Sequence, residues 1–93
     1  MKTRIQSGDT DNLIDILDNL NYKIIYNTGA TIYGVYQKNV NFIQVAICLD
    51  IELIDVHIEH NGNKIDKYIT IPVNMTKYDL MILLEQLKLN LEN

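Results

Sequence analysis

The first regular hydrophobic pattern in the chain predicts an amphipathic helix. Apolar residues recur three or four positions apart, which places them on one side of an α-helix: Leu13, Ile16, Leu17 and Leu20. Asp9, Thr10 or Asp11 can begin this helix, because a short side-chain oxygen accepts hydrogen bonds from the free N–H groups of the first turn. We expect about three turns, ending near residues 19–21.

The middle of the chain alternates between apolar and polar residues, which is typical of β-strands. We expect five strands, over residues 22–27 and 31–37, from residue 41 onward, and over 53–59 and 64–71. Ile54 and Val56 are out of phase with the alternation before them, and a shift by one residue exchanges the two faces of a strand. A tight turn or a bulge is therefore expected around residues 49–53. Asn61-Gly62 is typical of a type I′ hairpin turn and joins the last two strands.

The C-terminal helix has the clearest start. Thr76 is followed three residues later by Asp79, a spacing that predicts a capping box. A wide apolar stripe follows, which is expected to face the core: Leu80, Leu83, Leu84, Leu87 and Leu91. Tyr78, Ile82 and Leu89 form a second, partial stripe to one side. A helix packed on a sheet needs an apolar arc of only about 100°, so these three residues exceed what the core requires.

The resulting order, α-β-β-β-β-β-α, predicts an α+β fold: an antiparallel sheet of about five strands with the N- and C-terminal helices packed on one face. Ninety-three residues fit a single domain. We assign residues 9–93 to this domain and expect residues 1–8 to form a flexible tail. Several unrelated small binding proteins share this order of elements, and no motif in the chain singles out a family.

The charge of the chain restricts its partners. The net charge is −4 and the isoelectric point is about 4.9, and the eight basic residues are scattered. Affinity for nucleic acid comes mostly from Lys and Arg side chains that release counterions from phosphates. Direct nucleic-acid binding is therefore disfavoured, and we expect a larger, basic protein as partner, such as a nucleic-acid-binding effector.

Composition also indicates a compartment. Cys48 is the only cysteine, which fits a reducing environment, and no apolar run reaches the length of a signal peptide core or a membrane span. We expect a cytoplasmic protein without membrane contacts. Fifteen Ile and eleven Asn residues are both encoded by AT-rich codons, which favours a low-GC bacterium or one of its phages as the source.

One segment carries residues that can bind a metal. Asp55, His57 and Glu59 alternate along a predicted strand, so they share one face at spacings of about 6–7 Å. Imidazole with carboxylates is a donor set for divalent transition metals. The competing interpretation is a solvent-facing strand beside a hairpin, which we prefer, because the sequence offers no second cluster to complete a coordination shell.

The sequence offers little support for a catalytic function. Cys48 lies in an apolar strand, where a free cysteine usually packs as a small hydrophobe. The chain has no nucleophile elbow, phosphate-binding loop or CxxC pair. Ninety-three residues build only a thin core, which leaves little room for a catalytic pocket. We therefore expect neither an enzyme nor a bound cofactor.

Two sets of residues are candidates for partner binding. Asp11, Asp15 and Asp18 form an acidic stripe on the first helix, either a solubilising surface or a docking site for Lys and Arg clusters. Like charges four positions apart weaken a helix slightly, and Asp15 and Asp18 are too far from the helix start to benefit from its dipole. Tyr33 and Tyr36 point to opposite faces of the sheet, so at least one is exposed, and tyrosine is enriched at interfaces.

These observations favour a small acidic inhibitor or adaptor that occludes a basic site on a larger host protein. A phage or mobile-element protein of the anti-CRISPR or other anti-defence type is its most concrete form. The main alternative is a homodimeric structural or chaperone-like module, with Tyr78, Ile82 and Leu89 at a two-fold interface. A weaker alternative is a metal-dependent small-ligand binder or phosphoesterase built on His57.

Overall fold

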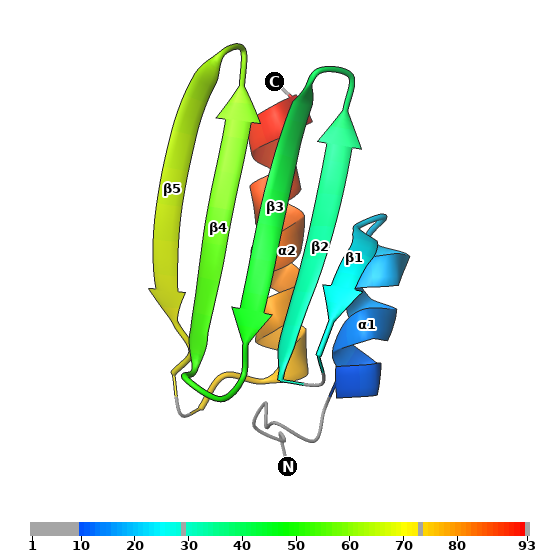
Figure 1. Cartoon of the computed structure of the whole chain (residues 1–93), viewed down its shortest axis with the longest axis vertical. Coiled ribbons are helices and arrows are strands. Elements are labelled where there is room, and N and C mark those ends of the chain that lie inside the picture. Colours follow the sequence, from blue (N-terminus) through cyan, green and yellow to red (C-terminus); the bar gives the residue numbers. More distant parts are fainter. Residues whose placement is uncertain (1–9, 29, 73, 93) are drawn as a thin grey trace.

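The protein is an α+β fold with two layers, as the order of elements predicts. A computed structural model describes residues 10–28, 30–72 and 74–92; the expected tail, residues 1–8, lies outside them. The elements are α1 (Thr10–Asn19), β1 (Lys23–Asn27), β2 (Thr31–Lys38), β3 (Asn41–Cys48), β4 (Leu53–His60), β5 (Asn63–Thr70) and α2 (Lys77–Glu92). Neighbouring strands pair antiparallel in the order β1-β2-β3-β4-β5. Both helices lie behind the same face of the sheet, α1 beside β1 and α2 behind the middle strands (Figure 1).

The end of α1 is fixed by its backbone. Asn21 adopts a left-handed conformation with φ of 67°, which Asn tolerates better than most residues. The N–H of Tyr22 donates to the carbonyl of Leu17 at 2.8 Å, and the N–H of Asn21 donates to the carbonyl of Asp18 at 3.0 Å. This pair of bonds is a Schellman motif. It turns the chain directly from α1 into β1 and buries Tyr22 beside Leu17.

The predicted turns are present. The change of phase after β3 is a four-residue turn between the paired residues Cys48 and Leu53, with Glu52 at φ of 53°. Asn61 and Gly62 both have positive φ, 53° and 84°, as a type I′ turn requires.

The start of α2 is the expected capping box. The N–H of Thr76 donates to Asp79 Oδ2 at 3.0 Å, and the N–H of Asp79 donates to Thr76 Oγ1 at 3.2 Å. Among the described residues, neither helix has the length and apolar character needed to cross a bilayer.

The core lies between the helices and the face of the sheet that they cover, called here the covered face. It is built from fully buried aliphatic residues of β2, β3 and β4 and from the inward residues of both helices. Gly34 of β2 lies directly beneath α1, where an added Cβ would be 3.5 Å from Leu17 Cδ1 and from Tyr22 Cβ. The hydroxyl group of Tyr22 donates to the backbone carbonyl of Leu84 at 2.8 Å. This hydrogen bond connects the α1–β1 junction to α2.

Candidate functional site

Apolar side chains remain exposed on the side of α2 that faces away from the sheet. Tyr78, Ile82 and Leu89, the three residues of the second stripe, are 60%, 39% and 55% exposed. Met81, beside them, is 36% exposed. The inward side of the same helix is buried as predicted, with Leu80 and Leu84 fully covered. The helix is therefore apolar on two opposite sides, and only one of them is used by the core.

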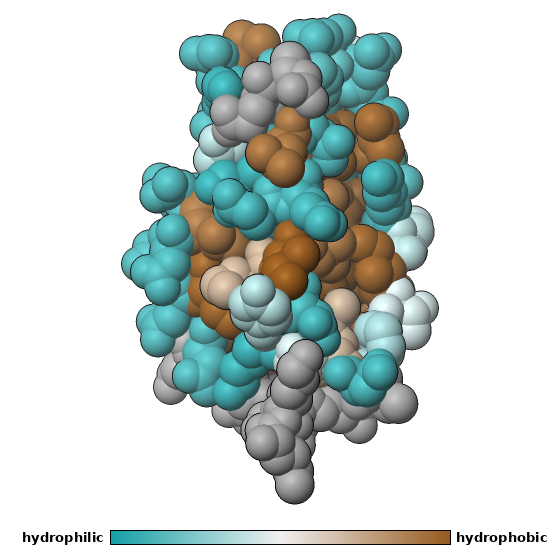
Figure 2. All heavy atoms as spheres, turned by 180° about the vertical axis from the view of Figure 1, so that it is seen from behind, coloured by the Kyte–Doolittle hydropathy of each residue, from teal (hydrophilic) through white to brown (hydrophobic). Residues whose placement is uncertain are grey.

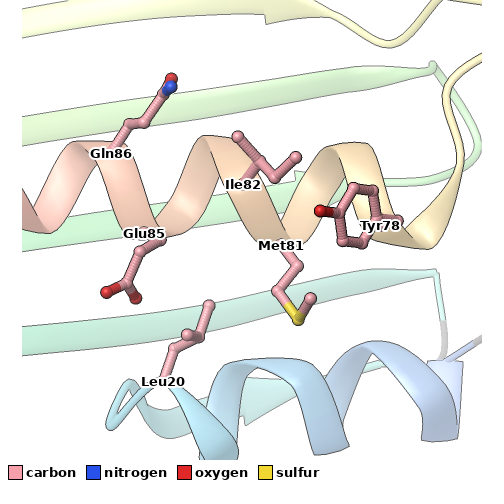
Figure 3. A pocket seen from close by; sticks show the side chains of 6 residues that line it. All are labelled: Leu20, Tyr78, Met81, Ile82, Glu85 and Gln86. Carbon is pink, nitrogen blue, oxygen red and sulfur yellow. The ribbon is translucent and has the colours of Figure 1, made fainter.

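A shallow hollow follows this side of α2. Its volume is about 400 Å³, and it is lined by Leu20, Tyr78, Met81, Ile82, Glu85 and Gln86. Leu20 extends from the end of α1 toward α2, while Met81 extends from α2 toward α1 (Figure 3). In the view onto the helices, apolar atoms are exposed along the middle of the molecule between hydrophilic ones (Figure 2).

Carboxylates lie on the same side of the helix layer as the hollow. Leu13 and Leu17 of α1 are fully buried against the sheet, so Asp15 and Asp18, on the opposite side of that helix, are exposed and point outward. The side chain of Asp11 lies outside the described part of the chain. Glu85, which is also exposed, lines the hollow itself, and Asp15 and Asp18 lie on the exposed side of the neighbouring helix. We call Asp15, Asp18, Leu20, Tyr78, Met81, Ile82, Glu85 and Leu89 the helix-layer surface.

Lys88 of α2 is largely covered, and it contacts the end of α1 and Glu85. Its side chain is only 13% exposed, and its Nζ donates to the carbonyl of Leu20 at 2.8 Å. The same Nζ lies 4.7 Å from the centroid of the Tyr36 ring and 3.7 Å from Glu85 Oε2. A cation at the C-terminal end of a helix interacts favourably with its last carbonyls and its dipole. Lys88 thus stabilises the end of α1 and is not presented to a partner.

The sheet face opposite the helices, called here the open face, carries tyrosines. Tyr33 is 39% exposed on it, whereas Tyr36 lies on the covered face, half-buried, 5.8 Å from the ring of Tyr22. The two tyrosines therefore point to opposite faces, as expected, and Tyr33 is the exposed one. The strand register also brings Tyr26 and Tyr68, which the sequence analysis did not select, into one row with Tyr33 across the sheet. To find this row from the sequence, the register of each pair of neighbouring strands would have to be known.

The residues with metal-binding chemistry lie in β4, and two of them contact each other. Asp55, His57 and Glu59 do share the open face, because Val56 and Ile58 between them are buried. However, His57 Nδ1 lies 2.6 Å from Asp66 Oδ1 and His57 Nε2 lies 2.9 Å from Glu59 Oε2. Both ring nitrogens are thus occupied by carboxylates, and no group of three possible ligands among the described residues is arranged to hold a metal ion.

The two carboxylates change the chemistry of His57. Hydrogen bonds to Glu59 and Asp66 favour the imidazolium form, and they raise the pKa of His57 above its usual value. The hollow beside it on the open face, lined partly by Tyr33, Asp55 and His57, measures only about 50 Å³. This group of residues is an ion-paired link between β4 and β5, with little room for a ligand.

One further hollow has a different character. It lies at the β1 edge of the sheet with a volume of about 400 Å³, and three of its five lining residues are polar: Asn21, Lys23 and Gln37, with Ile25 and Val35. It has no continuous apolar floor, and a cation lines it. The helix-layer surface is therefore the candidate site that combines an apolar seat with exposed carboxylates.

Comparison with protein-family models, with curated proteins and with solved structures found no match to the chain. The function must accordingly be argued from the chemistry of its surfaces.

Proposed function

We propose that the protein is a small acidic binding protein that covers a basic site on a larger protein through the helix-layer surface. The observation that carries this proposal is the exposed apolar side of α2, with Glu85 in its hollow and the exposed Asp15 and Asp18 on the neighbouring helix. Large apolar residues concentrated in one exposed patch are typical of interaction sites, and negative charge beside them favours a basic partner over an acidic or neutral one.

The mechanism is steric occlusion. The carboxylates of α1 speed up the encounter with a basic surface, since complementary charge acts mainly on the association rate. The apolar side chains of α2 then supply most of the contact energy, as buried apolar and aromatic residues do in other interfaces. A Lys- or Arg-rich site that binds nucleic acid is blocked once covered, so an anti-defence inhibitor acting on a host nuclease is the concrete form of this proposal.

The acidic stripe gives the first test. The chain serves as bait in a lysate of a low-GC bacterium, and the retained protein is purified and its binding kinetics are measured at several salt concentrations. Changing Asp11, Asp15 and Asp18 together to Asn should leave folding nearly intact, because exposed charges contribute little to stability. Association should become several-fold slower and less sensitive to salt.

A matched control is Asp50→Asn, which removes a carboxylate from the β3–β4 turn, outside the helix-layer surface, and should leave the kinetics unchanged. Retention of no basic protein above background contradicts the proposal. If the triple variant has the same association rate and the same salt dependence as wild type, the acidic stripe serves only to keep the protein soluble.

Self-association through the same residues is the second candidate function, favoured by the exposure of Tyr78, Ile82 and Leu89 on one side of a helix. Each copy carries a net charge of −4, so a symmetric pair brings like charges together, whereas a basic partner does not. Light scattering at tens of micromolar decides between them. A dimeric wild type that becomes monomeric on Ile82→Glu with Leu89→Glu establishes the homodimer.

A further inference from the structure

We infer that the helix-layer surface seats one basic amphipathic α-helix of the partner, with apolar side chains in the hollow over α2 and Lys or Arg side chains over Asp15, Asp18 and Glu85. This inference rests on the proposed function and specifies the part of the partner that is bound.

The geometry of the apolar residues favours a helix as the occupant. Tyr78, Ile82 and Leu89 lie four and seven residues apart, so they follow one side of α2 over about 16 Å. A helix that crosses α2 presents its own side chains at the same three- and four-residue repeat and can interdigitate with such a ridge. This corresponds to recognition of an amphipathic helix by an apolar groove.

An extended peptide is a poorer occupant. Peptides that bind as strands gain affinity from main-chain hydrogen bonds to the edge of a sheet. The middle of α2 has its backbone N–H and C=O groups engaged within the helix, so it offers no such bonds. A strand would instead pair with an edge of the sheet, and the apolar side of α2 would stay uncovered.

The polar groups at the hollow also argue against a small ligand. Sites for small molecules use several converging polar groups to orient their ligand. Here the polar groups of the six lining residues are the Tyr78 hydroxyl and the side chains of Glu85 and Gln86, and all three residues are exposed. The other three side chains are aliphatic or thioether groups, and a thioether adapts to packing.

Charge defines the other half of the partner. α1 contains no Lys or Arg, and its outward Asp15 and Asp18 lie on the same side of the molecule as Glu85. Lys88, the nearest described cation to Glu85, is engaged with the carbonyl of Leu20. A bound helix that carries positive charges on its flank toward α1 meets the exposed Asp15 and Asp18, while Lys88, 3.7 Å from Glu85 Oε2, balances part of the charge of Glu85.

The probe for this inference is a pair of synthetic amphipathic helical peptides with identical leucine positions. One carries lysine at every polar position and the other carries glutamate, and each is labelled for fluorescence anisotropy with the full chain. We expect the lysine peptide to bind and to become more helical by circular dichroism when bound. The glutamate peptide should not bind.

The decisive variant is Ile82→Glu, because it adds a negative charge at the centre of the apolar seat. If the lysine peptide is held by charge alone, the added carboxylate of Ile82→Glu tightens its binding but does not weaken it. If the peptide packs on Ile82 as a helix, the variant removes that apolar contact. The lysine peptide should then bind at least about tenfold more weakly, equivalent to about 1.4 kcal/mol. The matched control is Tyr68→Glu, which adds the same charge at a residue that is 71% exposed on the open face. It should bind the peptide as wild type does.

Leu89→Glu repeats the test seven residues further along the same side of α2, in case Ile82→Glu does not fold. Binding that is equal or tighter in both variants overturns the inference, as does a bound lysine peptide that stays unstructured. A wild-type dimer that the peptide does not dissociate would assign the surface to a second copy and also overturn it. If a basic partner is captured and its binding requires the aspartates of α1 but neither Ile82 nor Leu89, the proposed function stands. The inference that a helix packs on α2 is then wrong.

Discussion

At the scale of single residues, two polar side chains join different elements of the fold. The hydroxyl of Tyr22 crosses the core to the backbone of α2, and the ring of His57 joins β4 to β5 through Asp66. One contact is buried and the other is largely at the surface, so they should respond to different experiments.

Tyr22→Phe should lower the free energy of unfolding by about 0.5–1.5 kcal/mol, the usual net contribution of one hydrogen bond. The ring would keep its packing, and the carbonyl of Leu84 would keep its place in the helix, so the loss should lie toward the lower end. Burial raises the pKa of Tyr22 well above its ordinary value, so the hydroxyl stays protonated as a donor at any pH used. Urea unfolding measures the effect, with Tyr26→Phe, at an exposed tyrosine, as the control. Equal losses in both variants would contradict it.

His57 predicts a pH dependence of stability. Its pKa is raised in the folded protein by hydrogen bonds to Glu59 and Asp66, so the folded state holds the proton more tightly than the unfolded state. The stabilisation is fully present below the unfolded pKa of about 6.5, and it is lost as pH rises through the higher folded pKa.

The measurement is the urea midpoint of wild type and His57→Gln from pH 5.5 to pH 9. Wild type should lose stability over this range by more than the variant does, and the difference should be modest because the His57 side chain is 25% exposed. Parallel curves for the two proteins would show that the carboxylates do not stabilise the imidazolium.

At the scale of elements, the packing of α1 on the sheet depends on a position without a side chain. Gly34 lies beneath Leu17 and Tyr22, and an added Cβ would make ordinary contacts of 3.5 Å with both. Gly34→Ala should therefore be neutral or raise the free energy of unfolding by about 0.4–1 kcal/mol, since alanine restricts the unfolded chain.

A larger side chain at the same position should separate the two layers. Gly34→Leu has no space beneath Leu17, so α1 must move outward, and overpacking of this kind typically costs about 1–3 kcal/mol. Thermal unfolding of the two variants beside wild type measures both effects. A destabilised Gly34→Ala would mean that α1 packs more closely on β2 than these distances indicate.

At the scale of the whole molecule, the free edge of β5 needs protection from pairing with other copies. Lys67 projects on the covered face, because it pairs with the buried Val56, and it lies between Ile65 and Ile69 on that side of the strand. A charged residue that points inward on an edge strand opposes edge-to-edge association.

Lys67→Ile should therefore increase the fraction of oligomers or aggregates seen by light scattering. Lys64→Ile is the matched control: it removes the same charge from the same strand, but opposite Glu59 on the open face. Similar association of both variants would show that net charge, and not the position of Lys67, keeps the edge free.

Local sequence predicted the elements of this protein well. The capping box at Thr76 and the turn at Asn61-Gly62 depend on residues within three or four positions of each other, so their chemistry is visible in the chain. The change of phase after β3 was also interpreted correctly, because a strand cannot exchange its faces without a turn or a bulge. The same reasoning gave the α+β class, since two amphipathic helices and an alternating sheet must bury their apolar sides against each other.

What the sequence could not decide is which surfaces lie together. The acidic stripe of α1 and the second stripe of α2 are about sixty residues apart in the chain; the tertiary structure packs the two helices on the same face of the sheet (Figure 1), with Asp15, Asp18, Tyr78 and Ile82 exposed. Asp55, His57 and Glu59 form a possible ligand set in the sequence, whereas in the fold the ring of His57 pairs with Glu59 and with Asp66 of β5. In both cases a neighbour that the local pattern does not show comes from a different element. The pattern along a helix or strand determines which side of it is buried, but only the packing of one element on another determines what each exposed side chain meets.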